Sequence, residues 1–257
     1  MTVERNALES DAVYFEMAAR KIHLPGCEFV WMPELEELTS ASTAMRVDMT
    51  ADPCLLVREL EACVIKLGLP RFRIYLDKVS PEWSRVLTES GYKMRTERVQ
   101  AATGAEIRSA NPANVELELL EVVTLSDWSA REELFGLEQQ APDGHVVNAR
   151  LYIEMEKRKR QSGAISFYLA RGKAGGVVAS YGIMKYNGVV RLKNFIVHPD
   201  LRGKGVGSQV LTALSVLLPP DEPLIAFAVT SDNHPSLYDR NNFKNVGSCH
   251  EWTRSNR

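Results

Sequence analysis

The segment from Leu192 to Ser208 carries the residues with the clearest chemical meaning. It reads LKNFIVHPDLRGKGVGS, so an apolar run meets Pro199 and is followed by glycines interleaved with Arg202 and Lys204. Proline ends strand pairing because it has no N–H to donate. Glycine allows a sharp turn and a close approach of a ligand to the main chain. Because the first-turn amides of a helix lack internal acceptors and favour an anion, the pattern predicts a phosphate-binding strand–turn–helix.

The glycine spacing excludes two common nucleotide motifs. The dinucleotide fingerprint needs G-x-G-x-x-G, but the chain has G-x-G-x-G, and the hydrolase string G-x-x-x-x-G-K-[ST] is absent. The remaining pattern, R-x-x-G-x-G at Arg202, Gly205 and Gly207, resembles the acyl-CoA pyrophosphate signature of the GNAT superfamily of N-acetyltransferases. That resemblance covers roughly Val115 to Arg254 and implies acetyl-CoA as cosubstrate. The cofactor-binding residues that it implies in this turn are Arg202, Gly203, Lys204, Gly205, Val206, Gly207 and Ser208.

A second motif, Tyr238-Asp-Arg-Asn-Asn-Phe243, resembles the family's Y-x-x-x-G-F. In the family this tyrosine lies near the CoA sulfur and can protonate the departing thiolate, so the resemblance makes Tyr238 the catalytic acid. The alternative is a packed helix aromatic. Asn242 replaces the usual glycine, and asparagine is the non-glycine residue that best tolerates left-handed backbone. Asn233 is the nearest candidate for an asparagine that contacts the cofactor before this helix.

The resemblance also gives a role to the main chain of Phe195, Ile196 and Val197. In the family this strand end is splayed, hydrogen-bonds the pantetheine arm like an added strand, and offers an N–H to the thioester carbonyl. A plain core strand is the alternative, and both can hold because only backbone groups are used.

No general base is evident on this strand. Some family members carry a glutamate several residues before the V-H-P, but Val190–Asn194 contains no carboxylate. The amine can lose its proton to solvent, since a good base adds only about 10²–10⁴-fold. Arg191 or Lys193 facing the cleft would suit an anionic substrate. The other candidates for a base, each expected to be a solvated surface residue, are His145, Glu154, Glu156 and His198.

The charged run from Glu154 to Arg160 is interpreted as a solvated helix face. Its spacing places Glu154 beside Arg158, and Glu156 beside Arg160, as i, i+4 ion pairs.

Periodicity predicts a mixed α/β fold in which a mostly antiparallel sheet is flanked by helices. The Asn-Gly turn at 187–188 is a hairpin signal, and Ser126 or Asp127 is the expected N-cap of the first helix. Strands are expected at 115–122, 164–171, 176–186, 189–197 and 224–230, and a closing strand or hairpin is expected to end at 253. Helices are expected at 126–140, 146–161, 205–218 and, briefly, at 235–241.

The polar, periodicity-free stretch 101–114 predicts a linker. The predicted division is a domain at 1–105, a linker at 106–114 and a catalytic GNAT domain at 115–257. Shifted by 151 positions, the first half resembles the second: 55–67 falls on 206–218, and 71–77 falls on 222–228.

The chemistry is not repeated in the first half. The positions aligned with Arg202–Gly207 read ADPCLL, without glycine, and Leu87 stands where Tyr238 does. The prediction is therefore two GNAT-like domains, each a mostly antiparallel twisted sheet flanked by helices. The first would be degenerate and unable to bind CoA.

Composition narrows the classes of protein. The chain has 257 residues, a formal charge of −2 and 45% hydrophobic residues, typical of a globular protein. The balanced charge argues against nucleic-acid binding, and no apolar run of about 18 residues suggests a membrane span. The four cysteines form no C-x-x-C pair, so we expect reduced thiols, no metal site and a cytoplasmic location.

The function expected from the resemblance is acetyl transfer from acetyl-CoA to a primary amine of a small molecule, such as an amino acid, a polyamine or an amino-bearing antibiotic. Two alternatives remain open: a protein N-acetyltransferase, and a non-catalytic acyl-CoA-binding regulatory module. A tandem thiol-biosynthesis acetyltransferase, similar to mycothiol synthase, is a further option by analogy of architecture. The sequence identifies neither the amine nor the acyl chain length. It also leaves the oligomeric state open, with a homodimer as one option.

Overall fold

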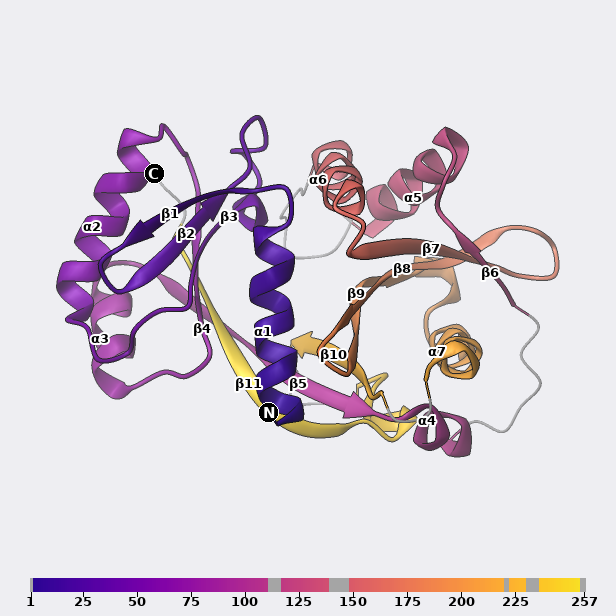
Figure 1. The fold of residues 1–257 in the computed structure, drawn as a ribbon. Helices are drawn as coiled ribbons and strands as arrows, with labels where there is room; N and C mark the ends of the chain where they lie inside the picture. Colours follow the sequence, from indigo (N-terminus) through magenta and orange to yellow (C-terminus); the bar gives the residue numbers. More distant parts are fainter. Residues whose placement is uncertain (1, 111–116, 139–147, 220–221, 230–235, 255–257) are drawn as a thin grey trace. The chain divides into compact units, whose positions relative to one another are not determined.

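The computed structural model describes residues 2–110, 117–138, 148–219, 222–229 and 236–254 (Figure 1). The chain forms two compact units. The C-terminal unit consists of Met1–Ala7 and Val99–Gly247, and the N-terminal unit of Leu8–Arg98 and Ser248–Arg257. No helix among the described residues has the length and apolar character needed to cross a membrane.

The N-terminal unit is built on the strand order β1-β2-β3-β4-β11, in which β3 and β4 are parallel and the other neighbours are antiparallel. Its strands are β1 (Arg20–Leu24), β2 (Cys27–Trp31), β3 (Ser42–Met45), β4 (Arg73–Leu76) and the end of β11 (Lys244–Thr253). Its helices are α1 (Val3–Glu16), whose first turn belongs to the other unit, η1 (Thr39–Ala41), α2 (Pro53–Lys66) and α3 (Pro81–Glu89).

The core of this unit follows from the apolar spacing of its helices. Leu56, Leu60 and Val64 recur every four residues on α2 and are buried in a cluster that also contains Ile74 of β4. Because neighbouring residues of a strand point to opposite faces, Tyr75 lies on the other side of β4. There its ring packs edge-on against Phe15 of α1, at 5.1 Å between ring centroids.

The C-terminal unit has the strand order β5-β10-β9-β8-β7-β6, with β9 and β10 parallel. Its strands are the end of β5 (Lys93–Ala102), β6 (Glu118–Glu121), β7 (Ile165–Arg171), β8 (Val177–Tyr186), β9 (Val189–Val197) and β10 (Leu224–Val229). Its helices are α4 (Gly104–Ala110), α5 (Leu125–Glu138), α6 (Ala149–Gln161), η2 (Pro199–Leu201), α7 (Val206–Leu217) and η3 (Asp239–Asn241). Figure 1 shows α5 and α6 on one face of this sheet and α7 with α4 on the other.

The predicted mixed α/β fold is confirmed, and most predicted elements of the second half lie within a few residues of their expected bounds. One cap was placed wrongly: α5 begins at Leu125, so its cap is Thr124, whose Oγ1 accepts from the Asp127 N–H at 3.2 Å. Asp127 accepts in return from the Thr124 N–H at 2.8 Å, which completes a reciprocal cap. The short helix expected at 235–241 is only the 3-10 turn η3 over the described part of that range.

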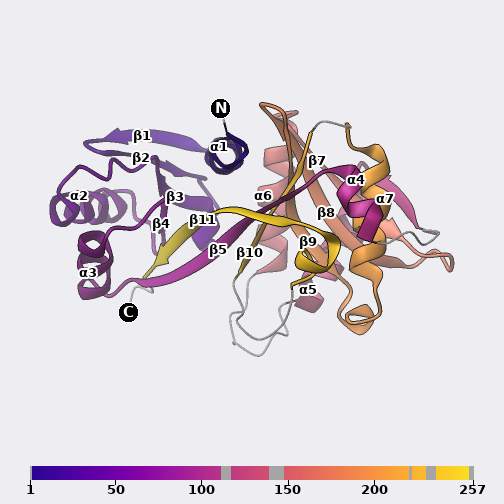
Figure 2. The same ribbon diagram turned by 90° about the horizontal axis from the view of Figure 1, so that it is seen from below.

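The predicted linker was also wrong in its described part. Residues 101–102 end β5, and 104–110 form α4. Thr103 and Glu106 cap this helix reciprocally, with Thr103 N to Glu106 Oε2 at 2.9 Å and Glu106 N to Thr103 Oγ1 at 3.3 Å. The sequence carried this T-x-x-E signal. Helix α4 lies alongside α7 (Figure 2), and Arg108 donates to the Ser215 carbonyl at 2.7 Å.

Each half of the chain supplies the last strand of the other half's sheet. Residues Val99–Ala102 of β5 belong to the C-terminal unit, where β5 neighbours β10. Residues His250–Thr253 of β11 pair with Leu76–Arg73 of β4 in the N-terminal unit. The first residues are also exchanged, since Asn6 Nδ2 donates to the Asn187 carbonyl at 2.7 Å. The predicted division of the chain at 106–114 did not include these exchanged segments, because long-range strand pairing leaves no signal in the local sequence.

The internal similarity corresponds to a shared local arrangement. In both halves a strand, a helix and a second strand parallel to the first follow one another: β3–α2–β4 and β9–α7–β10. Shifted by 151 positions, β4 and α2 fall on β10 and α7.

Candidate active site

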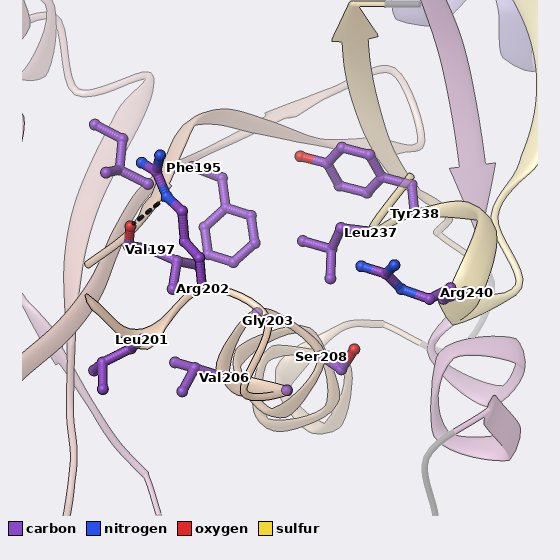
Figure 3. A pocket seen from close by; sticks show the side chains of 13 residues that line it. Phe195, Val197, Leu201, Arg202, Gly203, Val206, Ser208, Leu237, Tyr238 and Arg240 are labelled. Atoms are coloured by element: carbon purple, nitrogen blue, oxygen red, sulfur yellow. Dashed lines mark hydrogen bonds between the residues drawn. The ribbon is translucent and has the colours of Figure 1, made fainter. Parts of the chain in front are cut away.

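A cavity of about 650 Å³ opens in the C-terminal unit where β9 ends, α7 begins and η3 passes (Figure 3). It is lined by Phe195, Ile196, Val197, Leu201, Arg202, Gly203, Gly205, Val206, Gly207, Ser208, Leu237, Tyr238 and Arg240. The structure therefore brings most of the predicted site residues together. Lys204 belongs to the same turn but is not part of the lining, and Asn233 lies outside the described residues.

The turn before α7 is open backbone. Gly203 and Gly205 have φ values of 74° and 79°, a left-handed conformation that glycine adopts without strain. A Cβ added to either would meet no atom within 4 Å. Gly205 is the N-cap of α7 and has no side chain to accept from the first-turn amides. These amides border the cavity and are available to an anion.

Among the α-helices of the described residues, only α7 begins without a side chain that caps its first turn. The other six begin with a side chain that accepts from a first-turn N–H. Their caps are Thr2, Asp52, Ser80, Thr103, Thr124 and Asn148. Such a cap contributes about 0.5–2 kcal/mol to stability. A helix that omits its cap while facing a cavity is suited to a bound anion.

Two other residues of the motif hold the turn in place. Gly207 is buried, and a Cβ there would lie 3.0 Å from Leu237 Cδ2, so this glycine permits close packing of α7 on the η3 segment. Arg202 Nε donates to the Val197 carbonyl at 3.3 Å and ties the turn to the end of β9 (Figure 3).

Tyr238 lies across the cavity from the β9 wall, with its hydroxyl directed into the space (Figure 3). Its ring packs edge-on against Phe243, 5.2 Å between centroids. Between them Asn242 has φ 63°, so the expected left-handed conformation is confirmed. The Asn242 side chain donates to the Glu106 carbonyl at 3.0 Å, which anchors this turn on α4.

Comparison with known proteins identifies the fold. Residues 163–245 match the family model described as an acetyltransferase (GNAT) domain. This unit carries a GNAT domain. A search of curated proteins gives no match.

Solved structures support the same fold over the whole chain. A GCN5-related N-acetyltransferase from Kribbella flavida superposes with a TM-score of 0.69 at 11% identity, covering 100% of this chain and 97% of its own. A functionally unknown conserved protein from Staphylococcus epidermidis gives 0.71 at 13%, covering 94% and 96%. A tandem GNAT protein from the clavulanic acid biosynthesis pathway gives 0.55 at 15%, covering 88% and 77%. At these identities the likeness concerns the fold.

The β9 wall of the GNAT domain separates from its neighbour. Among the described residues, β9 pairs with β10 only at Val190 and Arg191. Against β8, the register shifts by one residue between Lys193 and Ile196, so β9 contains a bulge. Tyr181 lies opposite the bulge, and burial raises the pKa of its phenol. Past this divergence from β10, Phe195, Ile196 and Val197 line the cavity.

One candidate base, Glu156, lies in the interior of the protein. Glu156 was expected on the surface with Arg160 as its partner, and both expectations were wrong. It is 0% exposed and pairs with Arg131, while Arg160 pairs with Glu121 at 3.1 Å. The α6 pattern concealed this because the partner of Glu156 lies on another helix.

Of the remaining candidate bases, Glu154 and His198 make local contacts within their own segments. The predicted pair of Glu154 and Arg158 is confirmed at 3.2 Å. His198 caps η2 by accepting from the Asp200 N–H at 3.3 Å. His145 lies outside the described residues. Among the described residues, no group of three or more His, Cys, Asp or Glu side chains is arranged to hold a metal ion. All four cysteines are free thiols.

The two cations of β9 are buried. Arg191 is 3% exposed, lies 3.6 Å above the Phe227 ring and donates to the Leu192 and Ile225 carbonyls. These contacts give it a structural role instead of the substrate contact that the sequence suggested. Lys193 is also buried.

Sequence reasoning missed Arg240, whose side chain lines the cavity from η3 (Figure 3). Its place two residues after Tyr238, inside the recognised motif, was the available signal. It adds positive charge to the wall opposite Arg202.

Proposed function

We propose that the protein is an acetyl-CoA-dependent N-acetyltransferase that acts on a primary amine of a small molecule, such as an amino acid, a polyamine or an amino-bearing antibiotic. The observation that carries the proposal is the uncapped start of α7 opening onto a cavity with the β9 wall and Tyr238 on its sides. A turn with a purely structural role would not need an uncapped helix start beside a space of this size.

The residues present fit acetyl-CoA. The open backbone at Gly203 and Gly205 leaves room for a pyrophosphate, and Arg202 and Arg240 provide positive charge at the cavity wall. Acetyl-CoA supplies an acetyl group activated as a thioester.

The chain's own groups would act in two ways, and solvent would act in a third. Main-chain N–H groups of Phe195–Val197 would stabilise negative charge that develops on the carbonyl oxygen. The Tyr238 hydroxyl would hold the proton that the leaving thiolate needs. The acceptor amine must be neutral to attack, and because β9 carries no carboxylate at 190–194, its proton would pass to solvent.

Two measurements test the proposal. Titration calorimetry with CoA should give binding with one site per chain, since the counterpart turn of the first half has no glycine and its helix is capped by Asp52. A free-thiol assay with acetyl-CoA and a panel of amines, including a lysine peptide, should then detect CoA release with a small amine.

The outcomes separate the alternatives. Release with the peptide alone would indicate a protein N-acetyltransferase. Binding without release across the panel would favour a non-catalytic acyl-CoA-binding module. No CoA binding at all would overturn the proposal.

A further inference from the structure

The bulge in β9 decides which side chains reach the cavity. On β8, Ser180 lies opposite Ile196 and Gly182 opposite Lys193, so two residues of β9 face Tyr181 alone. The extra residue shifts the alternation along the strand.

The shift is visible in the core cluster under α7. Val190 and Leu192 belong to this cluster before the bulge, whereas Phe195 and Val197 belong to it afterwards. An unbulged β9 would instead direct position 194 towards the cavity side.

The bulge needs support because its first residue is strained. Asn194 has φ 49°, a left-handed conformation that asparagine tolerates better than other residues with a Cβ but that still costs free energy. Such a conformation persists when surrounding contacts fix it.

A buried ion pair between α5 and α6 provides these contacts and reaches both strands. Asn194 Nδ2 donates to Glu156 Oε1 at 2.7 Å. Glu156 also receives both Nε and Nη2 of Arg131, at 2.5 and 2.7 Å, and both side chains are fully buried. Arg131 Nη1 donates to Ser180 Oγ, and Ser180 is the β8 partner of Ile196 beyond the bulge. One ion pair therefore holds the bulged residue and the strand opposite it.

We propose that Arg131, Glu156 and Asn194 form a positioning network that fixes the β9 bulge and so sets where the main-chain groups of Phe195–Val197 meet the acyl end of the ligand. This inference rests on the proposed function for the identity of the ligand. The three residues act through the backbone and do not line the cavity.

The first test replaces Asn194 by glycine, which tolerates the left-handed backbone but lacks the link to Glu156. Asn187→Gly is the matched control, since Asn187 also has positive φ (42°) but lies in the exposed turn between β8 and β9. Calorimetry with CoA and with acetyl-CoA compares a ligand without the acyl group and one with it.

We expect Asn194→Gly to weaken acetyl-CoA binding about three- to tenfold, the value of one hydrogen bond lost between the displaced main chain and the acyl carbonyl. CoA binding should change less than twofold, because the pyrophosphate is held by the turn at 203–208. With an amine that serves as substrate, kcat should fall at least tenfold. Equal losses for both ligands, or no loss for either, would overturn the inference.

Hydrogen exchange provides a readout that does not depend on the ligand. Asn194→Gly and Glu156→Gln should both speed amide exchange at 194–197, whereas Asn187→Gly should leave it unchanged. If the wild type binds neither ligand, the proposed function fails while the exchange data still judge the network. Unchanged exchange at 194–197 in Asn194→Gly would overturn the network even in a protein that binds acetyl-CoA.

Discussion

Helices α2 and α7 occupy the same position in two similar strand–helix–strand arrangements, but they begin in opposite ways. At α2, Asp52 Oδ1 accepts from the amides of Cys54 and Leu55 at 2.8 and 3.4 Å, and Pro53 removes a further donor. At α7, Gly205 offers no cap and the amides border a cavity. A helix start can be capped by a nearby side chain or left without one, and this chain contains both arrangements.

The same contrast recurs at the segment after the second strand. Leu87 of α3 is 0% exposed and belongs to the core of the N-terminal unit, whereas its counterpart Tyr238 lines the cavity. The next equivalent pair, Tyr92 and Phe243, is buried in both halves. The first half thus has the packing residues of the arrangement but not the residue that lines the cavity in the second half.

The largest effect is expected at Tyr238. Tyr238→Phe keeps the ring on Phe243 but removes the hydroxyl, so kcat should fall about 10²–10⁴-fold, as for loss of a general acid. CoA affinity should stay within about twofold of the wild type, since the ring is retained. Tyr186→Phe, at the end of β8 away from the cavity lining, is the control, and steady-state thiol release is the measurement. A full rate in Tyr238→Phe would make this residue a packing side chain, as Leu87 is in the first half.

Transferring the α2 cap to α7 tests the comparison directly. Gly205→Asp places a carboxylate where the proposed phosphate binds, so CoA affinity should fall about 100-fold, equivalent to about 2.7 kcal/mol. Gly175→Asp is a close control, because Gly175 has the same φ of 79° and equally open surroundings, in the turn between β7 and β8. Calorimetry gives both affinities, and a Gly205→Asp protein that binds CoA normally would disprove phosphate binding at the start of α7.

The reverse change removes the cap of α2. Asp52→Ala should lower the free energy of unfolding by about 1 kcal/mol and leave CoA affinity and the single site unchanged. Urea denaturation measures the first effect, with Asp52→Asn as a control that keeps a capping oxygen. A second CoA site in Asp52→Ala would show that the cap alone closes the first half to the ligand.

The smallest expected effect is on the stability of α4, whose start is also capped by side chains of the protein, those of Thr103 and Glu106. The hydrogen bond from Lys244, at 2.6 Å, followed by that from the Thr103 amide, lowers the pKa of Glu106 from 4.5 to about 2. Because the folded pKa is depressed, the stabilisation is complete above about pH 4.5 and disappears as the pH falls towards 2.

Glu106→Gln should therefore be less stable than the wild type at pH 7, by under about 1 kcal/mol for so exposed a pair, and the difference should shrink between pH 4.5 and 2. Thermal melts at pH 7, 4.5 and 3 measure it. Glu133→Gln, at an exposed position of α5, is the control. A difference that stays constant across this range would exclude the Glu106 carboxylate as its source.

The sequence by itself determined the strand, turn and helix around Arg202–Ser208 and the left-handed Asn242, because proline, glycine and asparagine restrict their own backbone and apolar periodicity sets the element. Only the tertiary structure decided that Glu156 is buried against Arg131 and that β9 is bulged at Asn194. It also decided that β5 completes the sheet of the C-terminal unit and β11 that of the N-terminal unit. These features depend on groups far apart in the chain. Strand pairing and buried ion pairs are satisfied by whichever partner the fold brings near, and no local pattern names that partner.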